Sequence, residues 1–440
     1  MNDDSAPADL VIRARWVIPL PISGELLADH AVVVRDGRIE ALLPGEESTA
    51  IASRERIDLS EHVLLPGLVN AHGHAAMALL RGYADDLSLM PWLEQHIWPA
   101  EQAHVSAEFV RDGAALAIVE MLLSGTTTFS DQYFFPEAVA DLATEVGIRC
   151  QLAAPIFDFP TAYGSGSDDY LSKALALHDV CRGRDRISVA LGPHAPYTVS
   201  QDALSRIATY AAELDLAIQI HLHETRGEVL SHVEAHGERP IDTLDRLGLL
   251  GPRTQCVHMT DLGRQDIDRL VSTGAHVVHC PQSNMKLASG ACPVPTLLEA
   301  GVNLGLGTDG AASNNNLNLF DEMHSAALLA KHEAADPRAL SASETLHLAT
   351  LGGAAALGLD NRIGSLEVGK DADMIAVDLA GAATQPVYNP LSQLVYACNG
   401  SEVSHSWVAG EALVRDRRLV SIDAAEVLTR ARHWAHRIKA

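Results

Sequence analysis

Apolar and polar residues follow one pattern in the middle of the chain and another at its two ends. In the middle, apolar runs of about five to eight residues alternate with amphipathic stretches of about ten to eighteen. Strands that alternate with amphipathic helices indicate βα units around a parallel sheet. Eight such units predict an α/β fold, the (β/α)8 TIM barrel, whose chemistry lies at the C-terminal ends of the strands. The predicted strands are the segment that leads to His72, then residues 126–130, 149–154, 187–191, 217–223, 255–258, 276–280 and 302–307.

Both ends of the chain contain short strands and tight turns. Arg35-Asp36-Gly37-Arg38 follows an apolar run near the start, and Asp-Gly between apolar runs is a strong signal for a β-hairpin. We therefore predict a small β-sandwich domain formed jointly by residues 1–65 and 370–440, beside a barrel that spans residues 66–369. Its strand-like segments are residues 10–12, 16–18, 31–34, 373–377, 394–396 and 403–408.

Several predicted helices begin and end at residues that favour helix termini. Ser106 and Ser200 can cap helices because a serine side chain accepts hydrogen bonds from free backbone N–H groups. Pro136 suits the first turn of a helix, and Gly125 and Gly147 suit its C-terminal end. These signals place helices between the predicted strands, where the barrel requires them.

Charge and composition narrow the class of protein. The 440 residues carry a formal net charge of −25, and the isoelectric point is about 5.1. Such an acidic surface repels duplex nucleic acid and anionic membranes, so we expect neither as a partner. No apolar run approaches the roughly 20 residues of a membrane span, and the first residues lack the basic and apolar parts of a signal peptide.

The six cysteines lie apart along the chain, without a Cys-x-x-Cys pair. Cys150, Cys256, Cys280 and Cys398 sit in apolar runs, as buried free thiols do. Disulfides persist mainly in oxidising compartments. We therefore expect a cytoplasmic protein without disulfides.

The first strand of the predicted barrel leads to His72-Gly73-His74. Side chains alternate along a strand, so His72 and His74 share a face, whereas on a helix residues two apart would diverge by roughly 200°. Two imidazoles on one face at a strand end form half of a metal site. The alternative is a pair of surface histidines beside a turn.

Polar residues also follow four other predicted strands. A lone histidine near a strand end is more often a hydrogen-bonded core residue than a ligand. Five such positions at one end of one barrel are difficult to explain in that way. On strand five His221 and His223 share a face, so spacing alone does not decide which of them binds a metal. The residues are His194 after strand four, His221, His223 and Glu224 at strand five, His258 at strand six and Asp309 at strand eight.

Histidines with one carboxylate suit zinc or another borderline divalent ion, which lowers the pKa of a bound water from about 15.7 toward 7. Asp309 can bind the metal and accept the proton of that water. Glu224 can protonate the atom that gains electrons during the attack, and His258 can hold the water or the tetrahedral centre by hydrogen bonding. Barrels with two metals often bridge them with a modified lysine at strand four. The sequence there is Leu191-Gly192-Pro193-His194, which favours one metal.

Six motifs together resemble the amidohydrolase superfamily over about residues 10 to 420. Within it the chain is most similar to the 5′-methylthioadenosine/S-adenosylhomocysteine deaminases, beside the triazine hydrolases. The resemblance implies a (β/α)8 barrel, and we expect it to bind one zinc ion or another divalent metal such as iron. The motifs are PGLVNAHGH, HLHET, VHMTDL, HCPQSNMKLASG, GTDGAASNNN and the segment 364–373.

The resemblance also implies roles for individual residues. It assigns the metal to His72, His74, His221 and Asp309, and so selects His221 over His223. It makes Glu224 and Asp309 both catalytic and substrate-binding, with Glu224 as the proton shuttle and His258 as the residue that orients the water. Glu101 matches an acid that binds the ribose hydroxyls, since a carboxylate can accept two hydrogen bonds from a cis-diol. His194 matches a histidine that contacts the nucleoside.

The implied activity is hydrolytic deamination of adenine nucleosides at C6, foremost 5′-methylthioadenosine to 5′-methylthioinosine and ammonia. S-adenosylhomocysteine and adenosine are further candidate substrates. Family members that bind the homocysteine part use an arginine near the loop after strand three, and residues 150–181 contain no arginine and only Lys173. A carboxylate without a cation partner would lose its hydration uncompensated, which favours the methylthio compound. The loop instead offers Pro155, Ile156, Phe157, Phe159 and Tyr163 as an apolar surface.

Two other functions compete with this hypothesis. One is an aminohydrolase of the same scaffold that acts on a free base such as guanine or on an s-triazine, for which Glu101 would have no ribose to bind. The other is a non-catalytic scaffold protein, which would be expected to lose its ligands. Cytidine-type zinc deaminases need His-x-Glu and Pro-Cys-x-x-Cys. Here His223 and Glu224 are adjacent, and neither Pro281 nor Pro293 is followed by a paired cysteine motif, so we reject that class. We expect a small-molecule nucleoside as the partner and, from the resemblance, a homodimer or a larger homo-oligomer.

Overall fold

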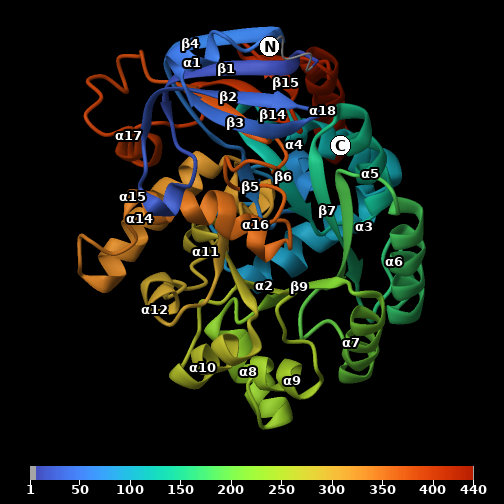
Figure 1. The fold of residues 1–440 in the computed structure, drawn as a ribbon. Coiled ribbons are helices and arrows are strands. Elements are labelled where there is room, and N and C mark those ends of the chain that lie inside the picture. The colour runs from blue at the N-terminus through green and yellow to red at the C-terminus, as the bar shows by residue number, and fades with distance from the viewer. Residues whose placement is uncertain (1–5, 440) are drawn as a thin grey trace.

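The computed structural model describes residues 6–439, and these residues form two eight-stranded sheets (Figure 1). The strands of one sheet are all parallel, and the other sheet combines strands from the two ends of the chain. Residues 1–5 and 440, which the predicted end domain includes, lie outside the described residues.

The parallel sheet is the predicted barrel. Its strands follow one another in chain order, and the backbone N–H of Ala71 donates to the carbonyl oxygen of Leu306 (2.8 Å) where the last strand meets the first. A further parallel bridge joins Gly73 to Asp309. The (β/α)8 fold is therefore confirmed. The strands are β5 (Leu68–Asn70), β6 (Thr126–Asp131), β7 (Arg149–Ile156), β8 (Ile187–Pro193), β9 (Ala217–Leu222), β10 (Thr254–His258), β11 (His276–His279) and β12 (Leu304–Leu306).

Helices cover the outside of the barrel, and their ends confirm the predicted signals. The Ser106 hydroxyl accepts from the N–H of Phe109, and the Ser200 hydroxyl accepts from the N–H of Ala203. Gly147 ends its helix with a φ of 91°, where a side chain would be strained. The helices between strands are α4 (Ala107–Leu123), α5 (Pro136–Val146), α6 (Ser167–Cys181), α7 (Gln201–Leu214), α8 (Arg226–His236), α9 (Pro240–Arg246), α10 (Arg264–Thr273), α11 (Pro281–Lys286) and α12 (Val294–Glu299).

Shorter helices after β5 and a group of helices after β12 complete the barrel domain. The first group lies over the C-terminal ends of the strands and contributes to the cavity described below. It comprises η2 (Ala75–Leu80), α2 (Leu89–Trp92), η3 (Leu93–Ile97) and α3 (Trp98–His104). The second comprises α13 (Ala311–Asn314), α14 (Leu319–Ala334), α15 (Ala342–His347), η4 (Leu348–Gly352) and α16 (Gly353–Ala356).

The second sheet joins the two ends of the chain, as predicted. Antiparallel pairing of β4 with β13 links the N-terminal strands to the C-terminal ones, and Ile12, Met374 and Trp407 share one buried apolar core. The hairpin at Asp36-Gly37 is confirmed, whereas the domain limits stay a prediction. In sheet order the strands are β16 (Arg418–Leu419), β15 (Glu411–Arg415), β14 (Val403–Val408), β13 (Met374–Asp378), β4 (Ser53–Pro66), β1 (Ala8–Val17), β2 (Leu27–Arg35) and β3 (Arg38–Pro44).

The expected strand at residues 394–396 is wrong, because these residues belong to helix α17 (Pro390–Tyr396). The Asn389 side chain accepts hydrogen bonds from the N–H groups of Leu391 and Ser392, and Pro390 occupies the first turn. This cap outweighs the β propensity of Val395 and Tyr396. The remaining elements are η1 (Pro21–Ser23), α1 (Gly45–Ser48) and α18 (Ala424–Lys439).

All six cysteines are free and buried, which extends the expectation made for four of them. Among the described residues, no helix has the length and apolar character that crossing a membrane requires. The cytoplasmic location stays a prediction.

Candidate active site

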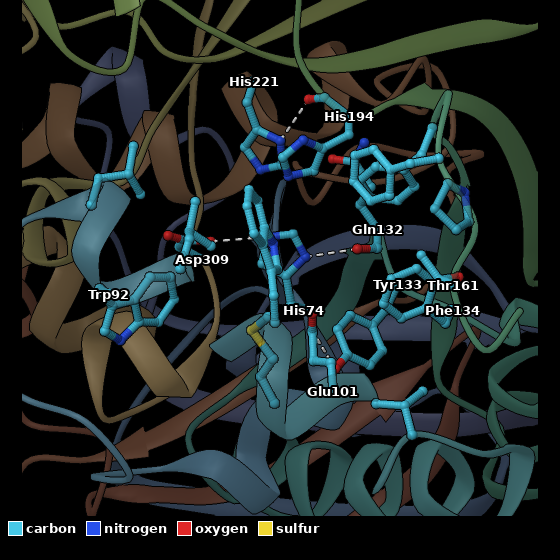
Figure 2. Close-up of a pocket in the computed structure, with 18 of the residues that line it drawn as sticks. His74, Trp92, Glu101, Gln132, Tyr133, Phe134, Thr161, His194, His221 and Asp309 are labelled. Atoms are coloured by element: carbon cyan, nitrogen blue, oxygen red, sulfur yellow. Dashed lines mark hydrogen bonds and ion pairs between the residues drawn. The ribbon is translucent and has the colours of Figure 1, made fainter. Parts of the chain in front are cut away.

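A cavity of about 550 Å³ opens at the C-terminal ends of the barrel strands (Figure 2). The cavity is lined by seven of the eight residues predicted for the site, namely His74, Glu101, His194, His221, Glu224, His258 and Asp309. The eighth, His72, is fully buried behind them. The fold therefore brings together residues that are up to 237 positions apart in the sequence, because the C-terminal ends of the strands meet at one end of the barrel.

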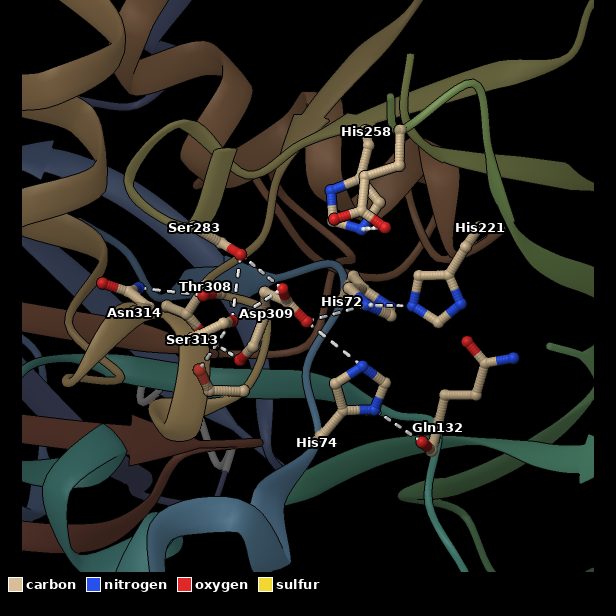
Figure 3. Close-up of polar contacts among 12 residues, drawn as sticks. His72, His74, Gln132, His221, His258, Ser283, Thr308, Asp309, Ser313 and Asn314 are labelled. Carbon is tan, nitrogen blue, oxygen red and sulfur yellow. Dashed lines mark hydrogen bonds and ion pairs between the residues drawn. The ribbon is translucent and has the colours of Figure 1, made fainter. Parts of the chain in front are cut away.

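Four side chains converge to form a candidate metal centre (Figure 3). One potential ligand atom from each of His72, His74, His221 and Asp309 lies within 4.8 Å of the others. Asp309 Oδ1 is 3.5 Å from His72 Nε2 and 3.1 Å from His74 Nε2, and the Nε2 atoms of His72 and His221 are 3.1 Å apart. Strand β5 ends at Asn70, before His72, yet both histidines still face Asp309.

The hydrogen bonds of the three histidines leave their Nε2 atoms free. Each Nδ1 lies against an oxygen that can only accept, so Nδ1 carries a proton in each ring. Burial lowers the pKa of His72 and of His221, which keeps these two rings neutral, whereas Asp309 raises the pKa of His74 despite its burial. The acceptors are Gln219 Oε1 for His72 (2.8 Å), the carbonyl oxygen of Gln132 for His74 (2.7 Å) and that of His194 for His221 (2.8 Å).

This donor set fits a divalent cation. Two Nε2 lone pairs that approach to 3.1 Å without a proton between them repel each other, and a cation between them removes the repulsion. The Ser283 and Ser313 hydroxyls donate to Asp309 Oδ2 at 2.6 and 2.9 Å. Because these bonds hold Oδ2, Oδ1 is turned toward the histidines. Three imidazoles and one carboxylate suit zinc or a similar metal.

His223, which spacing alone had left open as a ligand, points away from this centre. Its Nδ1 donates to the carbonyl oxygen of Asp261 (2.9 Å), and its Nε2 accepts from the N–H of Ile241 (3.2 Å). Both ring nitrogens are therefore used within the fold. The geometry agrees with His221 as the ligand from strand β9.

Glu224 is buried beside the candidate metal centre, one residue beyond His223. Burial and the nearby negative charge of Asp309 raise the pKa of Glu224 well above its usual range. Its Oε2 lies 3.8 Å from His258 Nε2. The Glu228 carboxylate accepts from the backbone N–H of Glu224 at 2.8 Å and so fixes the start of this loop. A carboxyl group with a raised pKa can carry and deliver a proton near neutral pH.

Glu101 is also buried in the lining of this cavity, where Tyr133 donates to its Oε1 at 2.7 Å (Figure 2). Burial raises the pKa of Glu101 to about 7, and the hydrogen bond from Tyr133 partly opposes this rise. Sequence reasoning had not included Tyr133, because its role depends on a contact between the loop after β6 and helix α3. The carboxylate retains capacity to accept hydrogen bonds from a ligand.

His194 faces the cavity as a neutral ring. Burial lowers its pKa to about 3, and its ring stacks on Phe157 with 4.8 Å between centroids. Its Nδ1 lies 3.0 Å from the Thr198 hydroxyl, which leaves Nε2 for other contacts. The stacked rings of His194 and Phe157 form an aromatic surface that suits a flat heterocyclic ligand.

The loop after β7 forms an apolar wall, although two of its predicted residues do not contribute. Pro155, Phe157 and Phe159 line the cavity. Ile156 and Tyr163 do not, because Ile156 is packed in the core at the end of β7 and the Tyr163 hydroxyl donates to Glu137 (3.3 Å).

The basic residues near this loop are engaged elsewhere. Lys173 contacts Asp169 (3.0 Å), and Arg149 lies at the start of β7, where it forms buried ion pairs with Asp371 and Asp373, both at 3.0 Å. The cavity wall, among the described residues, therefore contains neither lysine nor arginine.

The chain matches a known protein family and several named relatives over most of its length. Residues 63–413 match the family model described as the amidohydrolase family. A 5-methylthioadenosine/S-adenosylhomocysteine deaminase of Saccharophagus degradans is 51% identical over 99% of this chain and 98% of its own length. The corresponding protein of Teredinibacter turnerae is 48% identical over 98% of both chains.

Solved structures show the same fold. An adenosine deaminase from Xanthomonas campestris with bound zinc has a TM-score of 0.97 and 48% identity over 98% of this chain and 99% of that one. An atrazine chlorohydrolase from Arthrobacter aurescens complexed with zinc has a TM-score of 0.90 and 25% identity over 97% and 100% of the two chains. Since the family model covers most of the sequence and the relatives match almost its full length, the chain belongs to the amidohydrolase family.

Proposed function

We propose that this chain is a metal-dependent deaminase of adenine nucleosides that prefers 5′-methylthioadenosine. The observation that carries the proposal is that Glu224, Glu101 and three members of the four-residue metal group line one cavity. Relatives named 5-methylthioadenosine/S-adenosylhomocysteine deaminase, 44–51% identical over nearly the whole chain, support the same activity.

The metal group supports one zinc ion held by His72, His74, His221 and Asp309. A zinc ion there would supply Lewis acidity, which lowers the pKa of a bound water toward 7. A second ion would need further ligands, and the end of β8 offers Pro193 and His194 where a bridging lysine would be required. The imidazole rings of the site are held by backbone and amide acceptors, so they are ordered before a metal binds.

The proposed reaction uses three side chains of the cavity. Asp309 accepts a proton from the attacking water while the oxygen of that water forms a bond to C6 of the purine. Glu224, protonated because of its raised pKa, donates to N1, which gains the electron pair of the C6–N1 double bond. His258 holds the new C6 oxygen by hydrogen bonding. Asp309 then passes its proton to the amino group, and the C6–N bond breaks with loss of ammonia. The C6 hydroxyl returns its proton to Glu224 as the carbonyl forms, which restores both carboxyl groups.

Glu101 and His194 are proposed to hold the nucleoside. The Glu101 carboxylate, anchored by Tyr133, can accept from the 2′- and 3′-hydroxyls of a ribose. His194 lies between the metal group and the apolar wall, where it can contact the purine. A free base or an s-triazine has no ribose hydroxyls to donate to the buried Glu101, which disfavours those substrates.

The lining of the cavity supports preference for the methylthio compound. Phe157 and Phe159 offer apolar contacts, whereas no cationic side chain among the described lining residues faces the carboxylate of a homocysteine group. Burying that carboxylate without a partner would cost several kcal/mol of binding free energy.

Ammonia release from a substrate panel tests the proposal. The zinc-loaded protein is assayed with 5′-methylthioadenosine, S-adenosylhomocysteine, adenosine, adenine, guanine and an amino-s-triazine. We expect the highest kcat/KM for 5′-methylthioadenosine and no turnover of the free bases. A higher kcat/KM for a free base or a triazine would contradict a nucleoside deaminase, and equal values for the first two compounds would contradict the preference. Turnover of none of the six would favour the non-catalytic scaffold.

A further inference from the structure

One motif of the sequence, HCPQSNMKLASG at residues 279–290, has no part in the reaction described so far. It runs from the end of β11 into the short helix α11. Its neighbouring residues Ser283 and Asn284 are both fully buried, and each reaches a different side chain of the site. Ser283 donates to Asp309 Oδ2, and Asn284 Nδ2 lies 3.0 Å from His258 Nδ1.

His258 is held so that its two ring nitrogens face different surroundings. It is the last residue of β10, is 1% exposed and adopts a left-handed φ of 79°. Its ring stacks against that of His221, with 5.4 Å between centroids and 19° between the planes. Nδ1 faces α11 through Asn284, whereas Nε2 lies 3.8 Å from Glu224 Oε2 at the cavity.

The contact with Asn284 decides which nitrogen of His258 carries the proton. An amide nitrogen can only donate a hydrogen bond, so Nδ1 must accept. A neutral imidazole has one proton, which then resides on Nε2. The opposite tautomer would place two N–H groups against each other at 3.0 Å and leave Nε2 without a hydrogen.

The partners of Asn284 show that stability does not explain this amide. Its Oδ1 is buried without a hydrogen-bond partner. A buried acceptor that lacks a partner destabilises the folded state, and an apolar side chain would avoid that cost. The only side-chain hydrogen bond that the described structure gives Asn284 is the one to His258.

We propose that Asn284 is a positioning residue that fixes His258 as the Nε2–H tautomer, so that His258 donates a hydrogen bond to the oxygen added at C6. The assignment rests on the proposed deaminase function for the identity of that oxygen. Asn284 itself does not touch the substrate and acts only through His258. Donation from a fixed N–H strengthens as negative charge develops on the oxygen, which is where such a bond accelerates a reaction.

The tautomer can be measured directly by two-bond ¹H–¹⁵N NMR on protein labelled with ¹⁵N-histidine, with and without zinc. His258→Gln identifies the signals by their loss. In the wild-type protein we expect an unprotonated Nδ1 and a protonated Nε2 for His258. A protonated Nδ1 would overturn the proposal, and this measurement needs neither a substrate nor a variant of Asn284. If the wild-type protein releases no ammonia from any nucleoside, the proposed deaminase function is refuted, whereas the tautomer of His258 can still be measured.

Asn284→Asp adds a test of the consequence. A carboxylate at this position accepts from Nδ1–H, so it inverts the tautomer and leaves Nε2 without a proton. We expect the Nδ1 and Nε2 signals to exchange character and kcat to fall about 100-fold, with KM within threefold of wild type and zinc content unchanged. A kcat within threefold of wild type despite an inverted tautomer would overturn the catalytic role.

The chain offers a matched control. Asn303 Nδ2 lies 2.9 Å from His276 Nδ1 and also donates to the carbonyl oxygen of Gly352 (3.0 Å). This pair lies at the N-terminal side of β11 and β12, away from the cavity. Asn303→Asp should change the signals of His276 and leave kcat and the signals of His258 unchanged. A similar loss of kcat in Asn303→Asp would show that any inverted Asn–His pair impairs the enzyme, and would overturn the specific role of Asn284.

Discussion

The Tyr133 hydroxyl opposes the rise that burial causes in the pKa of Glu101, and its removal should change the pH dependence of substrate binding in a calculable way. The hydroxyl donates to Glu101 Oε1 at 2.7 Å in a buried environment. A hydrogen bond to a charged group contributes about 1.5 kcal/mol or more, which corresponds to roughly one pKa unit. Burial has already raised the pKa of Glu101 to about 7. In Tyr133→Phe the pKa should therefore rise to about 8.

The sign of the effect follows from which form of Glu101 accepts the ribose hydroxyls. Only the ionised carboxylate accepts from both, and the ionised fraction increases with pH. Below pH 6 the ionised fraction in Tyr133→Phe should be about tenfold lower than in the wild type, and above pH 9 the two should be nearly equal. The ratio of wild-type to variant kcat/KM for 5′-methylthioadenosine should therefore fall from about ten to about one as the pH rises.

The assay is kcat/KM from pH 6 to 9.5 for both proteins, because other titrating groups affect both equally and cancel in the ratio. Tyr163→Phe is the control, since its hydroxyl contacts Glu137 outside the cavity. We expect its ratio to stay near one throughout. A constant ratio for Tyr133→Phe across the pH range would refute the reasoning.

Three further predictions follow from named contacts. Glu224→Gln should lower kcat for 5′-methylthioadenosine by several orders of magnitude with metal content unchanged, as measured by ammonia release and metal analysis, and retained activity would remove Glu224 from the mechanism. Glu101→Ala should raise KM for nucleosides by about tenfold or more, because a charge-assisted hydrogen bond to the ribose is lost; an unchanged KM would argue against ribose binding at this site. Arg149→Leu should lower the free energy of unfolding by about 3–5 kcal/mol in thermal or denaturant unfolding, because Asp371 and Asp373 lose a buried partner; an unchanged stability would contradict this account.

The sequence predicted most of the barrel because its strands are buried on both faces and are separated by helices with clear ends. Each strand of the barrel in the structure overlaps an apolar run that predicted it, and the caps at Ser106 and Ser200 are present. The strand expected at residues 394–396 failed because a local cap at Asn389 determined the conformation. Apolar periodicity over three residues cannot distinguish a strand from a helix turn.

The candidate site was predictable as far as its residues follow strand ends. His72, His221 and Asp309 are of this kind, because position along the chain already places them at one end of the barrel. Residues that act through contacts between distant elements carry no such signal. Tyr133 meets Glu101 only because the loop after β6 lies against α3, and Asn284 meets His258 only because α11 lies against the end of β10.

The residues that hydrogen-bond to the metal group also act through contacts between distant elements, and they were missed although one of them had a weak signal in the sequence. Gln219 lies in the middle of β9, where a polar side chain in an apolar strand was the available signal. Its amide accepts from His72 and also donates to the carbonyl oxygen of Ala71 (3.1 Å). A buried glutamine in a barrel strand needs partners, and here one of them is a candidate metal ligand.

Ammonia release from 5′-methylthioadenosine before and after metal removal tests the central claim most directly. The purified protein is stripped by a chelator, assayed, reloaded with zinc to known stoichiometry and assayed again. We predict that activity disappears on stripping and returns in proportion to zinc, with full activity at one zinc per chain. Deamination at an undiminished rate by the stripped protein would contradict a metal-dependent deaminase, and full activity only at two zinc ions per chain would contradict the single-metal site.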